Sequence, residues 1–133
     1  MATNAVILRS DETQVLLTQR ADNGLWCLPG GLLEVGESLD ACVRREVMEE
    51  IGCVVEVDKL VGVYSQPNLR VMPPATHYLV VVCVLAQIVD GVPRTSNEVV
   101  STGFFPIDDL PTLVPNQSER IHHAATGAGT VLM

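Results

Sequence analysis

The chain has 133 residues, 47% of them hydrophobic, and this combination predicts one globular domain covering residues 1–133. Its 16 acidic and 8 basic residues give a formal net charge of −8, which argues against nucleic-acid binding because such binding relies on basic patches. The start of the chain lacks the basic segment and following apolar run of a targeting signal. The longest apolar stretch, 78–86, is shorter than the roughly 20 residues of a membrane helix. We therefore expect a soluble, cytoplasmic protein that does not enter the membrane.

Alternating and apolar runs predict five strands, most of them joined by short turns. A polar cluster at 10–13 turns the first strand into the second, and a glycine turn at 90–91 ends the longest one. The segment 26–31 ends in proline and two glycines, which force a tight and irregular backbone. The strands are expected at 5–9, 14–20, 54–63, 77–89 and 103–107.

Two helices are predicted. The first begins after Ser38, which is a good N-cap, and ends at Gly52, a natural C-terminal stop. The second covers 119–126 with Ser118 as its cap, and the tail 128–133 is expected to fray. Hairpin-linked strands with two helices predict an α+β fold in which a mixed sheet is sandwiched between helices.

Three glutamates gather on one face of the first predicted helix. Glu46, Glu49 and Glu50 are spaced i, i+3 and i+4, so their side chains meet. Carboxylates so near to one another repel each other, and the stability of the fold does not require this arrangement. A Mg²⁺ or Mn²⁺ ion, by contrast, needs oxygen ligands of this kind. The alternative is a solvated acidic face whose glutamates pair with Arg44 and Arg45.

The wider pattern at 31–53 resembles the signature of the Nudix hydrolase family, G-x5-E-x7-R-E-U-x-E-E-x-G-U, where U is a bulky aliphatic residue. Cys53 departs from the final aliphatic position, and we expect only a change in packing there. The segments 26–31 and 104–111 are also similar to the family. The resemblance implies a Nudix-like α/β/α sandwich with a mixed sheet and a catalytic loop–helix–loop. The matching residues are Gly31, Glu37, Arg45, Glu46, Val47, Glu49, Glu50 and Gly52.

The resemblance implies nucleophilic attack by water on phosphorus, assisted by Mg²⁺ or Mn²⁺. Glu37 and Arg45 would contact the metal ligands rather than the metal itself. The planar guanidinium of an arginine can hold carboxylates in one orientation. The alternative for Arg45 is a plain i,i+4 pair with Glu49. Glu50 is the strongest single candidate among the ligands. The implied ligands are the backbone carbonyl of Gly31 and the carboxylates of Glu46, Glu49 and Glu50.

The general base stays open at this point. A glutamate within the signature, Glu46 or Glu49, fits one option that the family uses. Glu98, just before the last predicted strand, fits the other option, a glutamate from a distant loop. Glu98 fits a surface loop residue equally well.

Residues outside the signature are candidates for substrate binding. Arg20 resembles an arginine that reaches substrate phosphates in the family, with an exposed strand-end charge as the alternative. Arg70 lies in the proline-containing segment 65–76, which either shapes substrate choice or is a flexible connector. Trp26 is expected to pack beneath the turn at 29–31, with stacking on a base as the alternative. The four cysteines are expected to be reduced and buried.

The function implied by the resemblance is that of a metal-dependent pyrophosphohydrolase acting on a nucleoside diphosphate linked to another moiety. ADP-ribose, nucleotide sugars and nucleoside triphosphates all remain open as the nucleotide-type substrate. The alternative is a catalytically silent Nudix-fold module that senses nucleotides or binds proteins, and the three retained glutamates count against it. An isomerase of allylic diphosphates would need further cysteine and glutamate machinery. A homodimer is compatible with the sequence.

Overall fold

The computed structural model describes residues 1–65, 80–127 and 129–133. Arg70 and most of the segment 65–76 therefore lie outside the described residues, as does the start of the strand expected at 77–89. Within the described ranges, no helix is long and apolar enough to cross a membrane.

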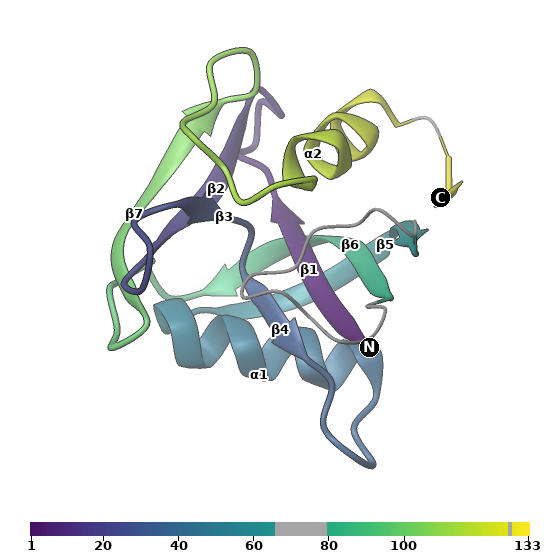
Figure 1. Cartoon of the computed structure of the whole chain (residues 1–133), viewed down its shortest axis with the longest axis horizontal. Helices are drawn as coiled ribbons and strands as arrows, with labels where there is room; N and C mark the ends of the chain where they lie inside the picture. Colours follow the sequence, from purple (N-terminus) through teal and green to yellow (C-terminus); the bar gives the residue numbers. More distant parts are fainter. Residues whose placement is uncertain (66–79, 128) are drawn as a thin grey trace.

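The strands of the described ranges form two sheets (Figure 1). They are β1 (Ala2–Ile7), β2 (Gln14–Arg20), β3 (Trp26–Cys27), β4 (Gly30–Leu32), β5 (Val54–Tyr64), β6 (Val81–Asp90), β7 (Val99–Pro106) and β8 (Val131–Leu132). The larger sheet has the order β4-β1-β6-β5-β8, and the smaller has the order β3-β2-β7. Because β6 runs parallel to β1 and antiparallel to β5, the larger sheet is mixed, as predicted.

The first helix, α1 (Leu39–Ile51), covers one face of the larger sheet (Figure 1). The side-chain oxygen of Ser38 accepts a hydrogen bond from the backbone nitrogen of Ala41 at 3.1 Å, which satisfies a free donor of the first turn. Gly52 ends the helix with a left-handed φ of 71°. Both predicted ends are confirmed. The apolar side chains that dock the helix on the sheet are Val43, Val47 and Ile51.

The second helix, α2 (Gln117–Thr126), lies on the opposite face of the larger sheet (Figure 1). Successive residues of a strand point to opposite faces, so β1 contributes to both cores. Ile7 packs in the core under α1, whereas Val6 packs with Ile121 in the core under α2. The sheet is therefore sandwiched between helices, as predicted.

Two strand starts were predicted too late. β1 begins at Ala2 rather than at Ala5, because Thr3 and Asn4 pair with β4 and β6 although their side chains are polar. β7 begins at Val99 rather than at Gly103, because its pairing with β2 already starts at Val99, opposite Arg20. In both places the partner strand holds residues whose own pattern does not indicate a strand.

The second half of the chain differs from the prediction at two further points. The tail does not fray at 131–132, because β8 pairs in parallel with β5. Asn116, not Ser118, is the residue before α2, and its side chain makes no capping hydrogen bond. Asn116 has a positive φ of 74°, a conformation that asparagine tolerates better than most residues.

Candidate active site

The glycine turn that leads to α1 is packed between β1 and the helix. Gly30 lies opposite Asn4 of β1, and Gly31 lies opposite Thr3. A Cβ atom at residue 30 would collide with the backbone carbonyl of Thr3, so this position requires glycine. A Cβ atom at residue 31 would lie 2.5 Å from Cδ of Glu46. The turn thus brings its backbone directly against a signature carboxylate.

Glu50 is a buried carboxylate that makes no ion pair with the described residues. Its side chain is 8% exposed, and Oε2 accepts a hydrogen bond from the backbone nitrogen of Gly30 at 3.0 Å. No ion pair joins it to an arginine or lysine of the described ranges. Burial raises the pKa of Glu50 to about 8; the Gly30 hydrogen bond and the charge of Arg20 oppose this rise, and the charges of Glu46 and Glu98 add to it. A bound cation would compensate the buried charge.

Arg45 holds several carboxylates of the signature at once. Its Nε and Nη2 atoms donate to the two carboxylate oxygens of Glu37 at 2.7 and 3.0 Å. Its Nη1 atom donates to Glu46 at 2.8 Å and to Glu49 at 3.3 Å. The Arg45 guanidinium lowers the pKa of Glu37 to about 2, so this pair stays ionised at neutral pH. The contact with Glu49 is thus one part of a larger network rather than a plain helix pair.

The three candidate metal ligands point in two directions. Glu46 and Glu49 face Arg45, whereas Glu50 faces the backbone of Gly30. Within the described residues, no three His, Cys, Asp or Glu side chains are grouped closely enough to hold an ion. The donor chemistry nevertheless fits Mg²⁺ or Mn²⁺, because carboxylate and backbone oxygens are hard ligands and buried Glu50 makes no ion pair among the residues that the structure describes.

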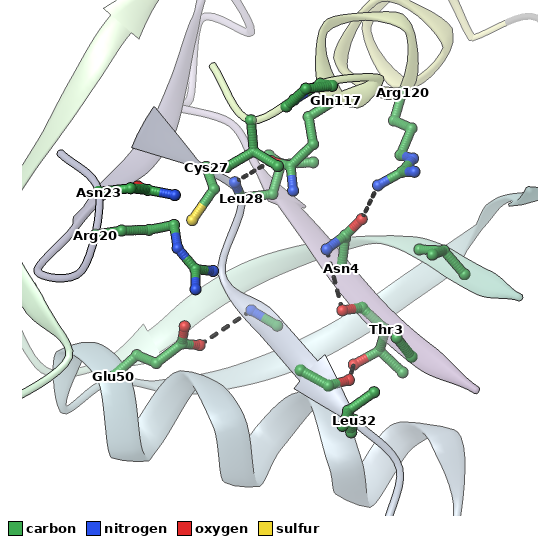
Figure 2. A pocket seen from close by; sticks show the side chains of 16 residues that line it. Thr3, Asn4, Arg20, Asn23, Cys27, Leu28, Leu32, Glu50, Gln117 and Arg120 are labelled. Carbon is green, nitrogen blue, oxygen red and sulfur yellow. Dashed lines mark hydrogen bonds between the residues drawn. The ribbon is translucent and has the colours of Figure 1, made fainter. Parts of the chain in front are cut away.

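Two cavities meet beside the glutamate helix. The first, of about 170 Å³, lies between the glycine turn, the start of β1 and the start of α2 (Figure 2). The second, of about 430 Å³, extends toward the loop before β7. Arg20, Cys27 and Glu50 line both cavities. Figure 2 shows Arg20 reaching from β2 and Glu50 reaching from α1 toward the same space.

The structure brings two of the candidate substrate-binding residues to this junction. The Nε and Nη2 atoms of Arg20 donate to the carboxylate of Asp22 at 2.9 and 2.6 Å. Glu98 is exposed and lines the second cavity together with Glu50. Arg70 falls outside the described residues, so its predicted contribution stays a prediction.

Trp26 and the cysteines belong to the packed interior. The Trp26 ring meets Phe105 edge-on, with the ring centroids 4.7 Å apart and the planes at 70°. Trp26 packs in the interior with Phe105 as its aromatic partner, and the predicted position beneath the turn at 29–31 stays a prediction. The cysteines are free and buried, as predicted: Cys27, Cys42, Cys53 and Cys83.

The far end of the first cavity holds three polar residues that the sequence did not single out. Asn4 comes from β1, and Gln117 and Arg120 come from the buried side of α2. A signal was present, because the helical spacing of 117, 120, 121 and 124 defines one buried face, and two of its four positions are polar. Reading that face as an amphipathic stripe would have marked Gln117 and Arg120.

Comparison with known proteins identifies the family. Residues 1–124 match the NUDIX domain. The chain is 37% identical over 125 residues to a MutT-like protein of Streptomyces ambofaciens, which covers 93% of this chain and 75% of the relative. The crystal structure of an ADP-ribose pyrophosphatase from Streptococcus suis is 30% identical, has a TM-score of 0.79, and covers 99% of this chain and 97% of that one.

A UDP-X diphosphatase structure, 24% identical with a TM-score of 0.84, covers 99% of this chain and 65% of that one and supports the fold alone. The shared fold confirms the predicted Nudix-like sandwich, and the family assignment confirms the reading of the 31–53 signature. The chain belongs to the Nudix family and is a hydrolase that acts on a phosphoanhydride bond.

Proposed function

We propose that the substrate is a nucleoside diphosphate linked to another moiety and that hydrolysis depends on a divalent metal. The observation that carries this proposal is the meeting of two cavities at Arg20 and Glu50, beside the glutamate face of α1. A substrate with a group on each side of its diphosphate can put one group in each cavity. ADP-ribose, for which the Streptococcus suis relative is named, nucleotide sugars and nucleoside triphosphates are the types to test, and the proposal does not depend on which base they contain.

Mg²⁺ or Mn²⁺ is the proposed cofactor. Glu50 is buried and makes no ion pair in the described ranges, and a cation beside it would favour the ionised form that its burial disfavours, which supports a cation at this point. When bound, the metal polarises the diphosphate and lowers the pKa of a bound water. The proposed ligands are the carbonyl oxygen of Gly31 and the carboxylates of Glu46, Glu49 and Glu50.

Arg45 and Glu37 are proposed to position the ligands rather than to touch the substrate. The two hydrogen bonds to Glu37 fix the guanidinium plane, and the remaining Nη1 atom then holds Glu46 and Glu49 in one orientation. On the other side, the Gly30 nitrogen orients Glu50.

Arg20 is proposed to bind a substrate phosphate. Asp22 occupies its Nε and Nη2 atoms, which leaves Nη1 for a phosphate oxygen at the junction of the cavities. Because the guanidinium is planar and rigid, the two hydrogen bonds to Asp22 also fix the direction in which Nη1 of Arg20 points.

Glu98 is the general base that we favour. Glu46 and Glu49 already contact Arg45, whereas Glu98 makes no ion pair within the described ranges and lines the cavity that also contains Glu50. In the proposed step, the oxygen of a water attacks phosphorus and Glu98 takes the proton of that water. The bond to the leaving phosphate breaks, and its electron pair goes to the phosphate oxygen.

A substrate panel tests the proposal. ADP-ribose, nucleotide sugars and nucleoside triphosphates are each incubated with Mg²⁺ or Mn²⁺, and phosphate is measured after treatment of the products with a phosphatase. We expect release of a nucleoside monophosphate and a complementary phosphorylated product. A folded protein that binds nucleotide but shows no turnover and no metal binding by calorimetry would instead support a catalytically silent sensing module.

A further inference from the structure

Arg120 is a buried cation without an anionic partner. Its side chain is 4% exposed, and it lies on the inner side of α2 at the end of the first cavity (Figure 2). No carboxylate of the described ranges lies within ion-pair distance of it, and every Asp and Glu of the chain falls in those ranges. A buried charge that is not paired is costly, so a group that accepts its hydrogen bonds is expected.

The protein satisfies this guanidinium only in part. Its Nη1 atom donates to Oδ1 of Asn4, and its Cζ atom lies 5.2 Å from the centre of the Tyr64 ring. Its Nε atom is buried and has no hydrogen-bond partner among the described residues. Burial accordingly lowers the pKa of Arg120. The Nη2 atom makes no hydrogen bond within the described residues and, unlike Nε, is not enclosed, so it is the donor of Arg120 that a ligand in the cavity can reach.

The neighbouring amides add a donor and no free acceptor. Oε1 of Gln117 accepts from the backbone nitrogen of Leu28 at 2.6 Å, which turns the amide nitrogen of Gln117 toward other partners. Oδ1 of Asn4 is taken by Arg120, and the Asn4 amide nitrogen donates to the backbone of Thr3 at 3.1 Å. Because both amide oxygens are already bonded, a ligand at this end meets donors from Arg120 and Gln117.

The cavity that holds these donors also has apolar lining. Leu28, Val81, Val114 and Pro115 line the same cavity. Arg120 and Glu50 lie at opposite ends of it in Figure 2. A phosphate at the Arg120 end would face apolar walls and lie away from the proposed metal ligands. A nucleobase can pack against the walls and present its edge to the donors.

We propose that Arg120 and Gln117 select a nucleobase that has a ring carbonyl, such as a 6-oxopurine, over its amino counterpart. The proposal rests on the proposed function, and it names the base that the same cleft takes. The O6 and N7 atoms of a 6-oxopurine are both acceptors, so one can accept from Nη2 of Arg120 and the other from the amide nitrogen of Gln117. Adenine places an amino donor at position 6, so a donor of the protein would face a donor of the base.

The test compares inosine 5′-monophosphate with adenosine 5′-monophosphate, which share ribose and phosphate and differ in the edge of the base at positions 1 and 6. Binding of each to the wild-type chain is measured by titration calorimetry. We expect the inosine nucleotide to bind roughly tenfold tighter or more, the size of discrimination of a good bidentate contact. This comparison needs no variant. Equal binding, or tighter binding of adenosine monophosphate, would overturn the proposal.

A substitution then assigns the preference to the residue. Arg120→Met keeps the length of the side chain without its donors, and we expect it to abolish the preference for inosine monophosphate. Arg9→Met is the matched control, because Arg9 is exposed, lies over the ring of Phe104 and does not line the first cavity. This substitution should leave the preference unchanged. Circular dichroism checks that the Arg120→Met variant is folded. If this folded variant binds both nucleotides more weakly by the same factor, Arg120 binds phosphate and the proposal is wrong.

Hydrolysis separates this proposal from the proposed function. ADP-ribose and its hypoxanthine analogue are compared in the presence of Mg²⁺. Equal kcat/KM values for the two would leave the proposed function standing and overturn the choice of base. No turnover of either, together with tighter binding of inosine monophosphate, would overturn the proposed function and support the choice of base.

Discussion

Arg45 and Arg120 are both held in place by the fold, but opposite kinds of groups surround them. Arg45 lies on α1 outside the lining of the two cavities, among four carboxylates at distances from 2.7 Å for Glu37 to 3.6 Å for Glu34. Arg120 is more deeply buried at the far end of the first cavity, where an amide oxygen and an aromatic ring are its partners in the described part of the chain.

The difference shows how a chain of net charge −8 can bind an anionic nucleotide. Around Arg45 the carboxylates outnumber the cation, so the region has negative charge left to attract a metal ion, which then reverses the local sign. Around Arg120 the donors outnumber the acceptors, so the region is left to attract carbonyl oxygens. The region around Arg45 would thus attract a cation, and the region around Arg120 would attract hydrogen-bond acceptors.

The largest effect is expected from Glu50→Gln. The amide keeps an oxygen for the Gly30 nitrogen but removes the charge that would bind the metal. We expect metal-dependent kcat to fall on the order of 100-fold or more, because loss of even an outer partner of a metal ligand costs roughly 10–100-fold. Thermal unfolding without metal serves as the control for folding. Near-normal turnover of this variant would remove Glu50 from the metal site.

Glu98→Gln tests the base. We expect kcat to fall by roughly 100-fold, within the range of general-base catalysis, while metal affinity measured by calorimetry stays unchanged. Glu56→Gln, at an exposed position of β5, is the matched control. An unchanged kcat would exclude Glu98 and return the role to Glu46 or Glu49.

Arg45→Lys tests the acidic end of the comparison. Lysine keeps the charge but cannot grip Glu37 with two parallel hydrogen bonds while also holding Glu46. We expect metal affinity to weaken by roughly 10-fold. The neighbouring Arg44→Lys should change nothing, because Arg44 is exposed and pairs with Asp40 at the surface. Equal effects of the two substitutions would contradict a special role for Arg45.

The smallest effect concerns stability and pH. The pKa of Glu37 is about 2 in the folded chain, below its ordinary value of 4.5, so the pair with Arg45 stabilises the fold above pH 4.5 and loses this effect as the pH falls toward 2. Glu37→Gln should therefore lower Tm by at most a few degrees at pH 7. The difference from wild type should shrink between pH 4.5 and 2. A difference that grows on acidification would contradict the assignment.

The acidic end was predictable from the sequence because its determinants are local. Ser38 and Gly52 mark the ends of α1, and the spacing places Glu46 and Glu49 together beside Arg45, although Glu50 turns away toward the Gly30 nitrogen. The family signature added Glu37 and Gly31, and the structure brings both next to the helix.

The donor end was not predicted, because its residues meet only through tertiary packing. Asn4 and Arg120 are 116 positions apart, and each reads as an ordinary polar residue in its own segment. The same reason explains the late prediction of β1 and the missed pairing of β8, since a distant partner strand supplies the hydrogen bonds in both cases. Polar residues on the buried face of α2 were the one local signal.

The most direct measurement locates the metal without relying on turnover. Mn²⁺ is titrated into the ¹⁵N-labelled protein, and paramagnetic broadening of backbone amide signals is followed by NMR. The account predicts that the signals of Gly30, Gly31 and Glu50 broaden first, whereas that of Arg120 persists at the opposite end of the cleft. Broadening that begins around Arg120, or no site-specific broadening at all, would contradict a metal site on the glutamate face of α1.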